Sequence, residues 1–249
     1  MRPLRLALAL AVLVAPPVLA ATPEELSSLD ALNKRRGDPA AVKEQEDALK
    51  KALEASPEDY ELLWRKARLI QWQADGAGNN PKLKKSLGKQ AWEVADQARK
   101  LAPARVEGHY FAAAGVGAYS QAVGIMKALG EGLESKFNER LDTAIKIDPQ
   151  FDRGAPLIAK GRYFFELPWP KRDLKKSAAL YDKVLAAHPE NLRAWTYLAE
   201  TRLKDGDAKA ALEAVNKALQ GSTDYDPPEA LRSQAEAKKV KADIDEELK

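Results

Sequence analysis

The chain has 249 residues, of which 45% are apolar and 31% charged, and this composition favours one substantial domain or two small ones over a disordered chain. Forty Lys and Arg against 37 Asp and Glu leave a formal charge of +3, which disfavours a general binder of nucleic acid or other polyanions. The absence of cysteine excludes disulfides, thiolate metal sites and a cysteine nucleophile.

The first twenty residues have the pattern of a secretory signal peptide. Arg2 and Arg5 precede an uninterrupted Leu, Ala and Val run over 6–14, and two prolines and small residues lead to Ala20. A retained membrane anchor is the alternative, but the run is about half of the roughly 20 apolar residues that a span needs. We therefore expect cleavage after Ala20, no membrane span afterwards, and a periplasmic or secreted protein. Losing the two arginines reduces the charge to +1, because 38 basic residues then face 37 acidic ones.

From Glu24 onward the apolar residues recur at helical spacing, and four prolines mark a longer repeat. Pro57, Pro103, Pro149 and Pro189 each end an apolar segment, at intervals of 46, 46 and 40 residues. Small residues keep fixed places around them, ten residues after each proline (Ala67, Ala113, Ala159, Ala199) and five before (Ala52, Ala98, Ala144, Val184). Proline stops a helix and small residues let helices approach closely, so the pattern predicts stacked antiparallel helix pairs.

The last unit of this repeat resembles the tetratricopeptide repeat (TPR). Trp195, Leu198 and Ala199 on one helix, and Ala211, Val215 and Ala218 on the next, follow the spacing of that family. The resemblance implies an all-α fold, a TPR-type α-solenoid of about five helical hairpins over 21–227. The charge-rich segment 228–249 has a thin apolar stripe and is expected to form a C-terminal capping helix.

The intervals between the prolines exceed the roughly 34 residues of a TPR unit by about 12, 12 and 6 residues. By the position of the small residues, each insertion falls at the turn inside a helix pair. Insertion of helical residues there would elongate the central hairpins. We therefore expect one edge of the solenoid to rise into a wall.

Residues 111–133 form an unusual part of this wall, with five glycines and two charges in 23 residues. One interpretation is close packing against neighbouring helices at Gly115, Gly117 and Gly124. The alternatives are the wall of a small-molecule cavity or a subunit contact in a homo-oligomer. In the cavity interpretation the wall residues would be Tyr119, Met126, Phe137, Phe164 and Trp169.

Residues 161–173 contain three consecutive aromatic residues followed by Leu167-Pro168-Trp169-Pro170. The prolines force an extended turn, in which Trp169 either caps the hydrophobic wall or anchors a ligand or partner. Together with Phe151-Asp-Arg-Gly-Ala and the glycine-rich segment, this stretch resembles the T component associated with TRAP transporters, over roughly 103–200. That resemblance implies an exported TPR protein that works beside a periplasmic solute-binding subunit.

The first helix of each pair lines the concave surface of a TPR array. Positions 4, 7, 11 and 14 after each proline should face this groove, and the candidate binding residues among them are Trp64, Arg68, Tyr110, Arg153, Lys160, Tyr163 and Arg193. Guanidinium and ammonium groups beside aromatic rings suit a carboxylate-bearing ligand or a peptide terminus. Alternatively, these cations solvate an exposed helix face.

Enzymatic signals are weak in this sequence. His109 stands where the repeat expects a packing residue, and His188 precedes a helix-ending proline, with no nucleophile at a recognisable spacing from either. We therefore predict no catalytic residue, metal or cofactor, and no nucleic-acid partner. The favoured function is docking of a protein partner such as a periplasmic solute-binding protein, with a small apolar or carboxylate ligand. A general scaffold for envelope assembly or secretion, without a small ligand, is the alternative.

Overall fold

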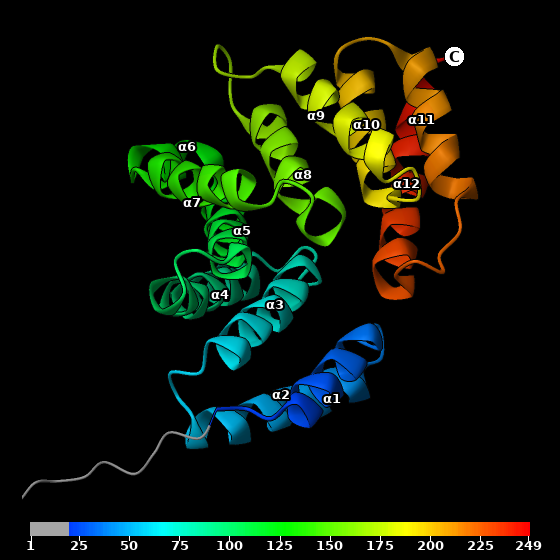
Figure 1. The fold of residues 1–249 in the computed structure, drawn as a ribbon. Coiled ribbons are helices and arrows are strands. Elements are labelled where there is room, and N and C mark those ends of the chain that lie inside the picture. The colour runs from blue at the N-terminus through cyan, green and yellow to red at the C-terminus, as the bar shows by residue number, and fades with distance from the viewer. Residues whose placement is uncertain (1–19) are drawn as a thin grey trace, which may run out of the picture.

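The computed structural model describes residues 20–249, so most of the expected leader lies outside the described residues. Over this range the chain is helical and contains no strand, as predicted (Figure 1). The helices are α1 (Pro23–Lys34), α2 (Pro39–Ala55), α3 (Tyr60–Asp75), α4 (Pro81–Leu101), α5 (Val106–Val123), α6 (Ile125–Gly130), α7 (Leu133–Ile147), α8 (Phe151–Glu166), α9 (Leu174–Ala187), α10 (Leu192–Lys204), α11 (Ala208–Gln220) and α12 (Pro227–Glu247). None of these described helices is long and apolar enough to cross a membrane.

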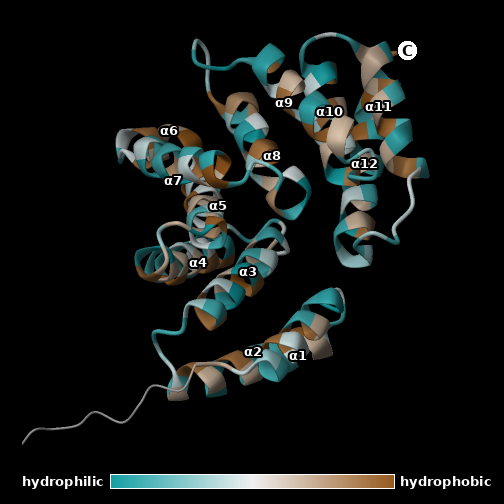
Figure 2. Ribbon diagram, viewed as in Figure 1, coloured by the Kyte–Doolittle hydropathy of each residue, from teal (hydrophilic) through white to brown (hydrophobic). Residues whose placement is uncertain are grey.

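The helices form five consecutive hairpins and a final helix. The pairs are α1 with α2, α3 with α4, α5 with α7, α8 with α9 and α10 with α11, while α6 lies within the third hairpin (Figure 1). Hydrophobic residues recur along one side of most helices, as expected where each helix buries one face (Figure 2). The α12 helix packs on α10 and α11, which confirms a helix covering the C-terminal end of the array.

The four prolines end helices as the sequence predicts. Each follows directly after a C-cap residue, which is Ser56, Ala102, Asp148 or His188. Such a position suits proline, because proline cannot continue a helix and favours an extended residue before it. In two of the four units the next helix then starts from an N-cap whose side chain accepts a backbone N–H, at Asp59 and Asn191.

Most of the recurrent small residues lie in the core, and Ala52 and Ala159 are half-buried. Ala67, Ala113 and Ala199 have no exposed surface, and neither do Ala98 and Ala144. The larger residues eight positions before the prolines, among them Leu49, Leu141 and Tyr181, are also fully buried or nearly so. The repeat in the sequence is therefore the repeat of helix contacts.

Glycines in the third hairpin have two different roles. A Cβ on Gly115 would lie 2.4 Å from the backbone nitrogen of Trp92, and one on Gly88 would lie 2.6 Å from that of Tyr119, so α4 and α5 pack too closely for side chains there. Gly124 was expected to do the same, but nothing lies within 4 Å of its Cβ position. Gly124 instead has a φ of 93°, which interrupts the helix between α5 and α6. Glycine adopts this positive φ without strain.

The start of α8 departs from regular helix geometry. Asp152, Arg153 and Gly154 have φ values of 46°, 56° and 81°, which form a short left-handed turn before the regular helix. Pro156 follows near the first turn of that regular segment, where its missing N–H costs no hydrogen bond.

The first two hairpins and the final helix meet along one seam. The seam consists of the α1–α2 connection and the C-terminal end of α3 on one side, and the N-terminal half of α12 on the other (Figure 1). Arg36 Nη2 lies 2.7 Å from Asp226 Oδ2, and a Cβ on Gly37 would contact Pro228 at 3.5 Å. The Arg232 guanidinium stacks 3.2 Å from the ring centroid of Trp72, and Arg36 lies 4.7 Å from the same centroid. The final helix therefore both covers the last hairpin and bridges back to the first.

Candidate functional site

A pocket of about 180 Å³ opens between the first helices of the central hairpins. Its walls come from α3, α5, α6, α7, α8 and α10, so residues far apart in the sequence share it. Its larger apolar lining residues include Ile125, Leu129, Leu133, Phe137 and Leu167. The elongated third hairpin supplies four of these five residues, which places its inserted segment in the wall of the pocket.

Charged side chains also line the pocket. Arg193 lies there with its Nε 3.0 Å from Glu229 Oε1, and Arg162 pairs with Glu166 at 2.7 Å and with Glu200. The Arg193 Nε is buried and has no geometrically sound hydrogen bond, although it is close to Glu229. A bound carboxylate could offer such an arginine a better-aligned acceptor than the protein does.

Glu134 and Tyr163 define one edge of the pocket. Tyr163 donates a hydrogen bond of 2.7 Å to Glu134 Oε1, while Lys171 lies 2.7 Å from the other carboxylate oxygen. The bonds from Lys171 and Tyr163 lower the pKa of Glu134, which therefore stays ionised at neutral pH. Burial, and secondly the Glu134 bond, raises the pKa of Tyr163, so its hydroxyl remains a donor.

The pocket brings together four of the residues that the sequence singled out. Tyr110, Tyr163 and Arg193 from the groove set and Phe137 from the cavity-wall set line it. The other predicted site residues lie elsewhere.

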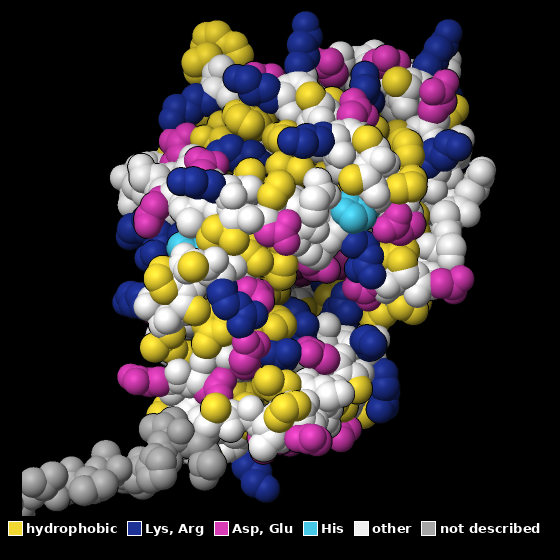
Figure 3. All heavy atoms as spheres, in the orientation of Figure 1, with side chains coloured by type: hydrophobic (Ala, Val, Ile, Leu, Met, Phe, Trp, Pro, Cys, Tyr) yellow, Lys and Arg dark blue, Asp and Glu magenta, His cyan; other side chains and the backbone are white. Residues whose placement is uncertain are grey.

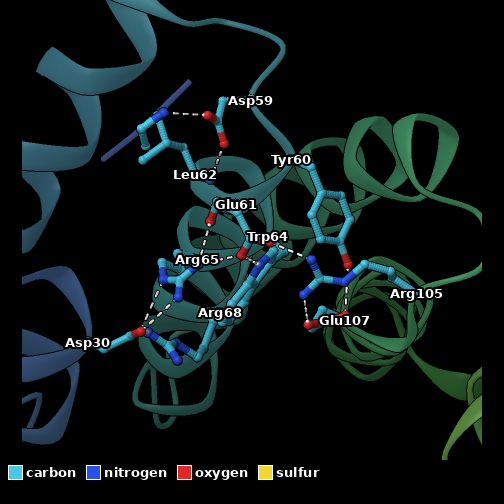
Figure 4. Close-up of polar contacts among 11 residues, drawn as sticks. Asp30, Asp59, Tyr60, Glu61, Leu62, Trp64, Arg65, Arg68, Arg105 and Glu107 are labelled. Atoms are coloured by element: carbon cyan, nitrogen blue, oxygen red, sulfur yellow. Dashed lines mark hydrogen bonds and ion pairs between the residues drawn. The ribbon is translucent and has the colours of Figure 1, made fainter. Parts of the chain in front are cut away.

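Trp64 and Arg68 belong to an ion-pair network that joins α1, α3 and α5 (Figure 4). Trp64 is 8% exposed and donates its indole N–H to Glu61 Oε2 at 2.8 Å, with Arg65 and Arg68 stacked 4.2 and 4.9 Å from its centroid. Arg65 and Arg68 both bind Asp30, each at 2.7 Å. Burial alone would raise the pKa of Asp30, but the two guanidinium bonds outweigh it and lower that pKa. These groups hold the first hairpin on the second.

Arg153 and Lys160 also bind neighbouring elements rather than line the pocket. Arg153, in the left-handed turn, donates to the Tyr225 carbonyl at 2.9 Å. Lys160 Nζ contacts Asn138 and Asp142 on α7, at 2.8 Å each. Both cations therefore have protein partners already.

Four of the five residues of the cavity-wall set do not line this pocket. Tyr119 packs edge-on against Trp92, and Phe164 packs against Tyr163 at a centroid distance of 5.2 Å, neither of them in the pocket wall. Met126 is 71% exposed because the pocket-facing side of the short α6 is formed by Ile125, Ala128 and Leu129. Trp169 is 86% exposed because the loop after α8 carries it beyond the pocket.

Arg162 and Tyr197 line the pocket but were not among the predicted residues. They lie 13 and 8 positions after Pro149 and Pro189, one position away from the spacings used to read the groove. A wider window on each first helix would have included both. The twist between successive hairpins rotates each helix slightly differently toward the groove, so one spacing cannot fit every unit.

The histidines have structural contacts. His109 is 6% exposed, with Nε2 2.9 Å from the Pro103 carbonyl oxygen, and His188 Nε2 lies 3.0 Å from Gln150. Within residues 20–249 no cluster of three or more His, Cys, Asp or Glu side chains is arranged to hold a metal ion.

Comparison with known proteins gives a family and a fold. The family model described as "Regulator of microtubule dynamics protein 1-3" matches residues 28–243. The crystal structure of TTC0263, a thermophilic TPR protein in Thermus thermophilus, is similar with a TM-score of 0.63 and 20% identity, over 87% of this chain and 98% of that one. Yeast Tom70 aligns with a TM-score of 0.34 and 19% identity, over 88% of this chain and 55% of Tom70. No curated protein sequence matches.

Proposed function

Since the chain belongs to the regulator of microtubule dynamics protein 1-3 family and has a TPR-like solenoid fold, we propose that it is a binding protein whose central pocket captures part of a partner or a small ligand. The observation that carries this proposal is the pocket itself, whose lining combines large apolar side chains with Arg162 and Arg193. An apolar body with a carboxylate end matches both kinds of lining side chain.

The occupant must compete with acidic groups already present. Arg193 and Arg162 are paired with Glu229, Glu166 and Glu200, so a ligand carboxylate would replace or share these partners. Apolar contact with residues such as Phe137 and Leu133 would supply affinity, and the arginines would select the charged end.

We further propose that the protein is exported and that its partner is a periplasmic solute-binding protein. The signal-peptide pattern of residues 1–20 and the resemblance of roughly 103–200 to the TRAP T component support this. A general envelope scaffold without a small ligand is the competing function. Native mass spectrometry of protein purified from its own envelope distinguishes them, because a bound small molecule supports the pocket proposal and a bound polypeptide alone supports the scaffold.

A pocket-filling variant tests the site directly. Ala114 lines the pocket, so Ala114→Phe should occupy the space and remove the co-purifying ligand or the captured partner segment. Ala179→Phe makes the same change on the exposed face of α9 and should retain the bound molecule. Equal retention by Ala114→Phe and Ala179→Phe, with both variants folded by circular dichroism, would place binding outside this pocket.

A further inference from the structure

The loop between α8 and α9 presents a tryptophan that the described fold does not use. Trp169 is 86% exposed, whereas Trp64 is 8% exposed and packed in the core. The loop itself is well held, since the backbone N–H groups of Lys171 and Arg172 donate to the Pro168 carbonyl at 2.9 and 3.1 Å. Asp173 N–H closes the loop on the Phe164 carbonyl at 3.2 Å. A hydrogen-bonded turn flanked by prolines therefore projects a large apolar ring into solvent.

Basic side chains surround this tryptophan. Lys171, Arg172, Lys175 and Lys176 are all exposed, and Asp173 is the one acidic residue between 168 and 176, which leaves a net charge of +3 (4 − 1). Asp173 caps α9 by accepting from Lys176 N–H, so its carboxylate has a local structural role. Lysines in the first turn of a helix oppose its dipole. Lys176 pairs with Asp173 at 3.1 Å, but the remaining basic charge is not explained by the stability of α9.

The loop lies at the rim of the central pocket. Leu167 lines the pocket, and Lys171 Nζ reaches Glu134 Oε2 at 2.7 Å, at the start of α7. Figure 3 shows hydrophobic atoms projecting at the end of this loop, with Lys and Arg side chains near it and Asp and Glu side chains among them. An exposed apolar group and a basic surface thus occur together beside the pocket mouth.

We propose that this loop docks the protein on an anionic phospholipid surface, with the Trp169 ring at the level of the headgroups. Tryptophan prefers the membrane–water interface, and each Lys or Arg near an anionic bilayer adds electrostatic attraction. The ordered turn reduces the loss of freedom on docking. The lysines favour a lipid partner over a protein, because lysine is depleted at the centres of protein interfaces.

Co-sedimentation with phosphatidylcholine vesicles, with and without phosphatidylglycerol, tests the proposal. Two forms of the protein are measured, the full chain and the chain from Ala21, and the second contains every described helix. Each variant is compared with the parent protein of the same form. We expect binding by the form from Ala21 that requires phosphatidylglycerol and weakens with added salt. Lys175→Ala with Lys176→Ala should weaken it about 30-fold, at the attraction expected per basic residue. Trp169→Ala should weaken it about tenfold through lost apolar contact.

The matched control is Lys82→Ala with Lys85→Ala, which removes two exposed lysines from the first turns of α4, where no exposed tryptophan accompanies them. This pair should change vesicle binding less than twofold, well below the α9 pair. Three results would overturn membrane docking. The two lysine pairs could lose vesicle binding equally, Trp169→Ala could bind as well as its parent, or the form from Ala21 could fail to bind vesicles. A different outcome would assign the loop to a protein interface instead. In that case the parent protein would not bind vesicles, and Trp169→Ala would lose a protein partner that the parent binds. The pocket proposal stands or falls separately on Ala114→Phe.

Discussion

At the scale of single residues, the third hairpin depends on glycines whose missing side chains set the distance between α4 and α5. Gly115 faces the backbone of Trp92 rather than a side chain, and a Cβ there would also lie 3.0 Å from the Gly88 carbonyl oxygen. Backbone atoms in the middle of two long helices cannot move aside as a flexible side chain can. The helices must separate to admit even one methyl group.

We therefore expect Gly115→Ala to lower the free energy of unfolding by about 1–3 kcal/mol, despite the higher helix propensity of alanine. Gly130→Ala, at the end of α6, provides the control, since nothing lies within 4 Å of its Cβ position. That control should be neutral or stabilise by up to about 1 kcal/mol. Urea unfolding of both variants measures the difference. Equal stabilities would mean that α4 and α5 can separate to admit a methyl group at little cost.

At the scale of the helices, the sequence predicts the hairpins because proline and small residues act locally. Pro103 ends α4 whatever the rest of the chain does, and Ala98 is buried because a fixed number of residues separates it from that stop. The same argument extends to the lengthened α4 and α5, of 21 and 18 residues. The left-handed turn at Asp152 and Arg153 has no such local signal, because residues other than glycine rarely adopt positive φ.

The pocket is only partly predictable for the same reason. Tyr110, Tyr163 and Arg193 face it at the spacing read from the prolines. Arg162 and Tyr197 reach it through the rotation of their own hairpins, and Trp64 turns instead into the contact between α3 and α5. Neighbouring residues in the sequence determine which face of a helix packs on its partner within a hairpin. The rotation between successive hairpins, in contrast, results from many contacts between distant residues.

Ala144→Trp tests the small-residue contacts of the hairpin elements. Ala144, on α7, has no exposed surface and belongs to the core that α3, α4, α5 and α7 share. An indole there should overfill the contact and cost about 3 kcal/mol or more, so that the melting transition is lost or strongly lowered. Lys146→Trp, on the exposed side of the same helix, should leave the transition nearly unchanged. A native-like melt of Ala144→Trp by circular dichroism would contradict close packing at this position.

At the scale of the whole molecule, the seam turns an open array into one whose first and last elements touch. Arg36 and Asp226 are 190 residues apart, and their meeting depends on the summed rotation of all five hairpins. The pair is mostly buried, with side chains 10% and 20% exposed, and the Trp72 ring lies near two guanidinium groups. Removing one partner of such a buried pair lowers the free energy of unfolding substantially, unlike removal of one partner of an exposed ion pair.

We expect Arg36→Ala to loosen the seam and broaden the separation between the first hairpin and α12. Because the sequence contains no cysteine, spin labels at Glu44→Cys and Lys239→Cys report this distance without further changes to the chain. Electron paramagnetic resonance should give a narrow distance distribution in the parent and a broader, longer one in Arg36→Ala. Arg35→Ala, which removes an arginine side chain that is 63% exposed and paired with Asp38 at 3.4 Å, should leave the distribution unchanged. Identical distributions in the parent and Arg36→Ala would mean that packing of α12 on α10 and α11 alone fixes the closed arrangement, and that the ion pair across the seam contributes little to it.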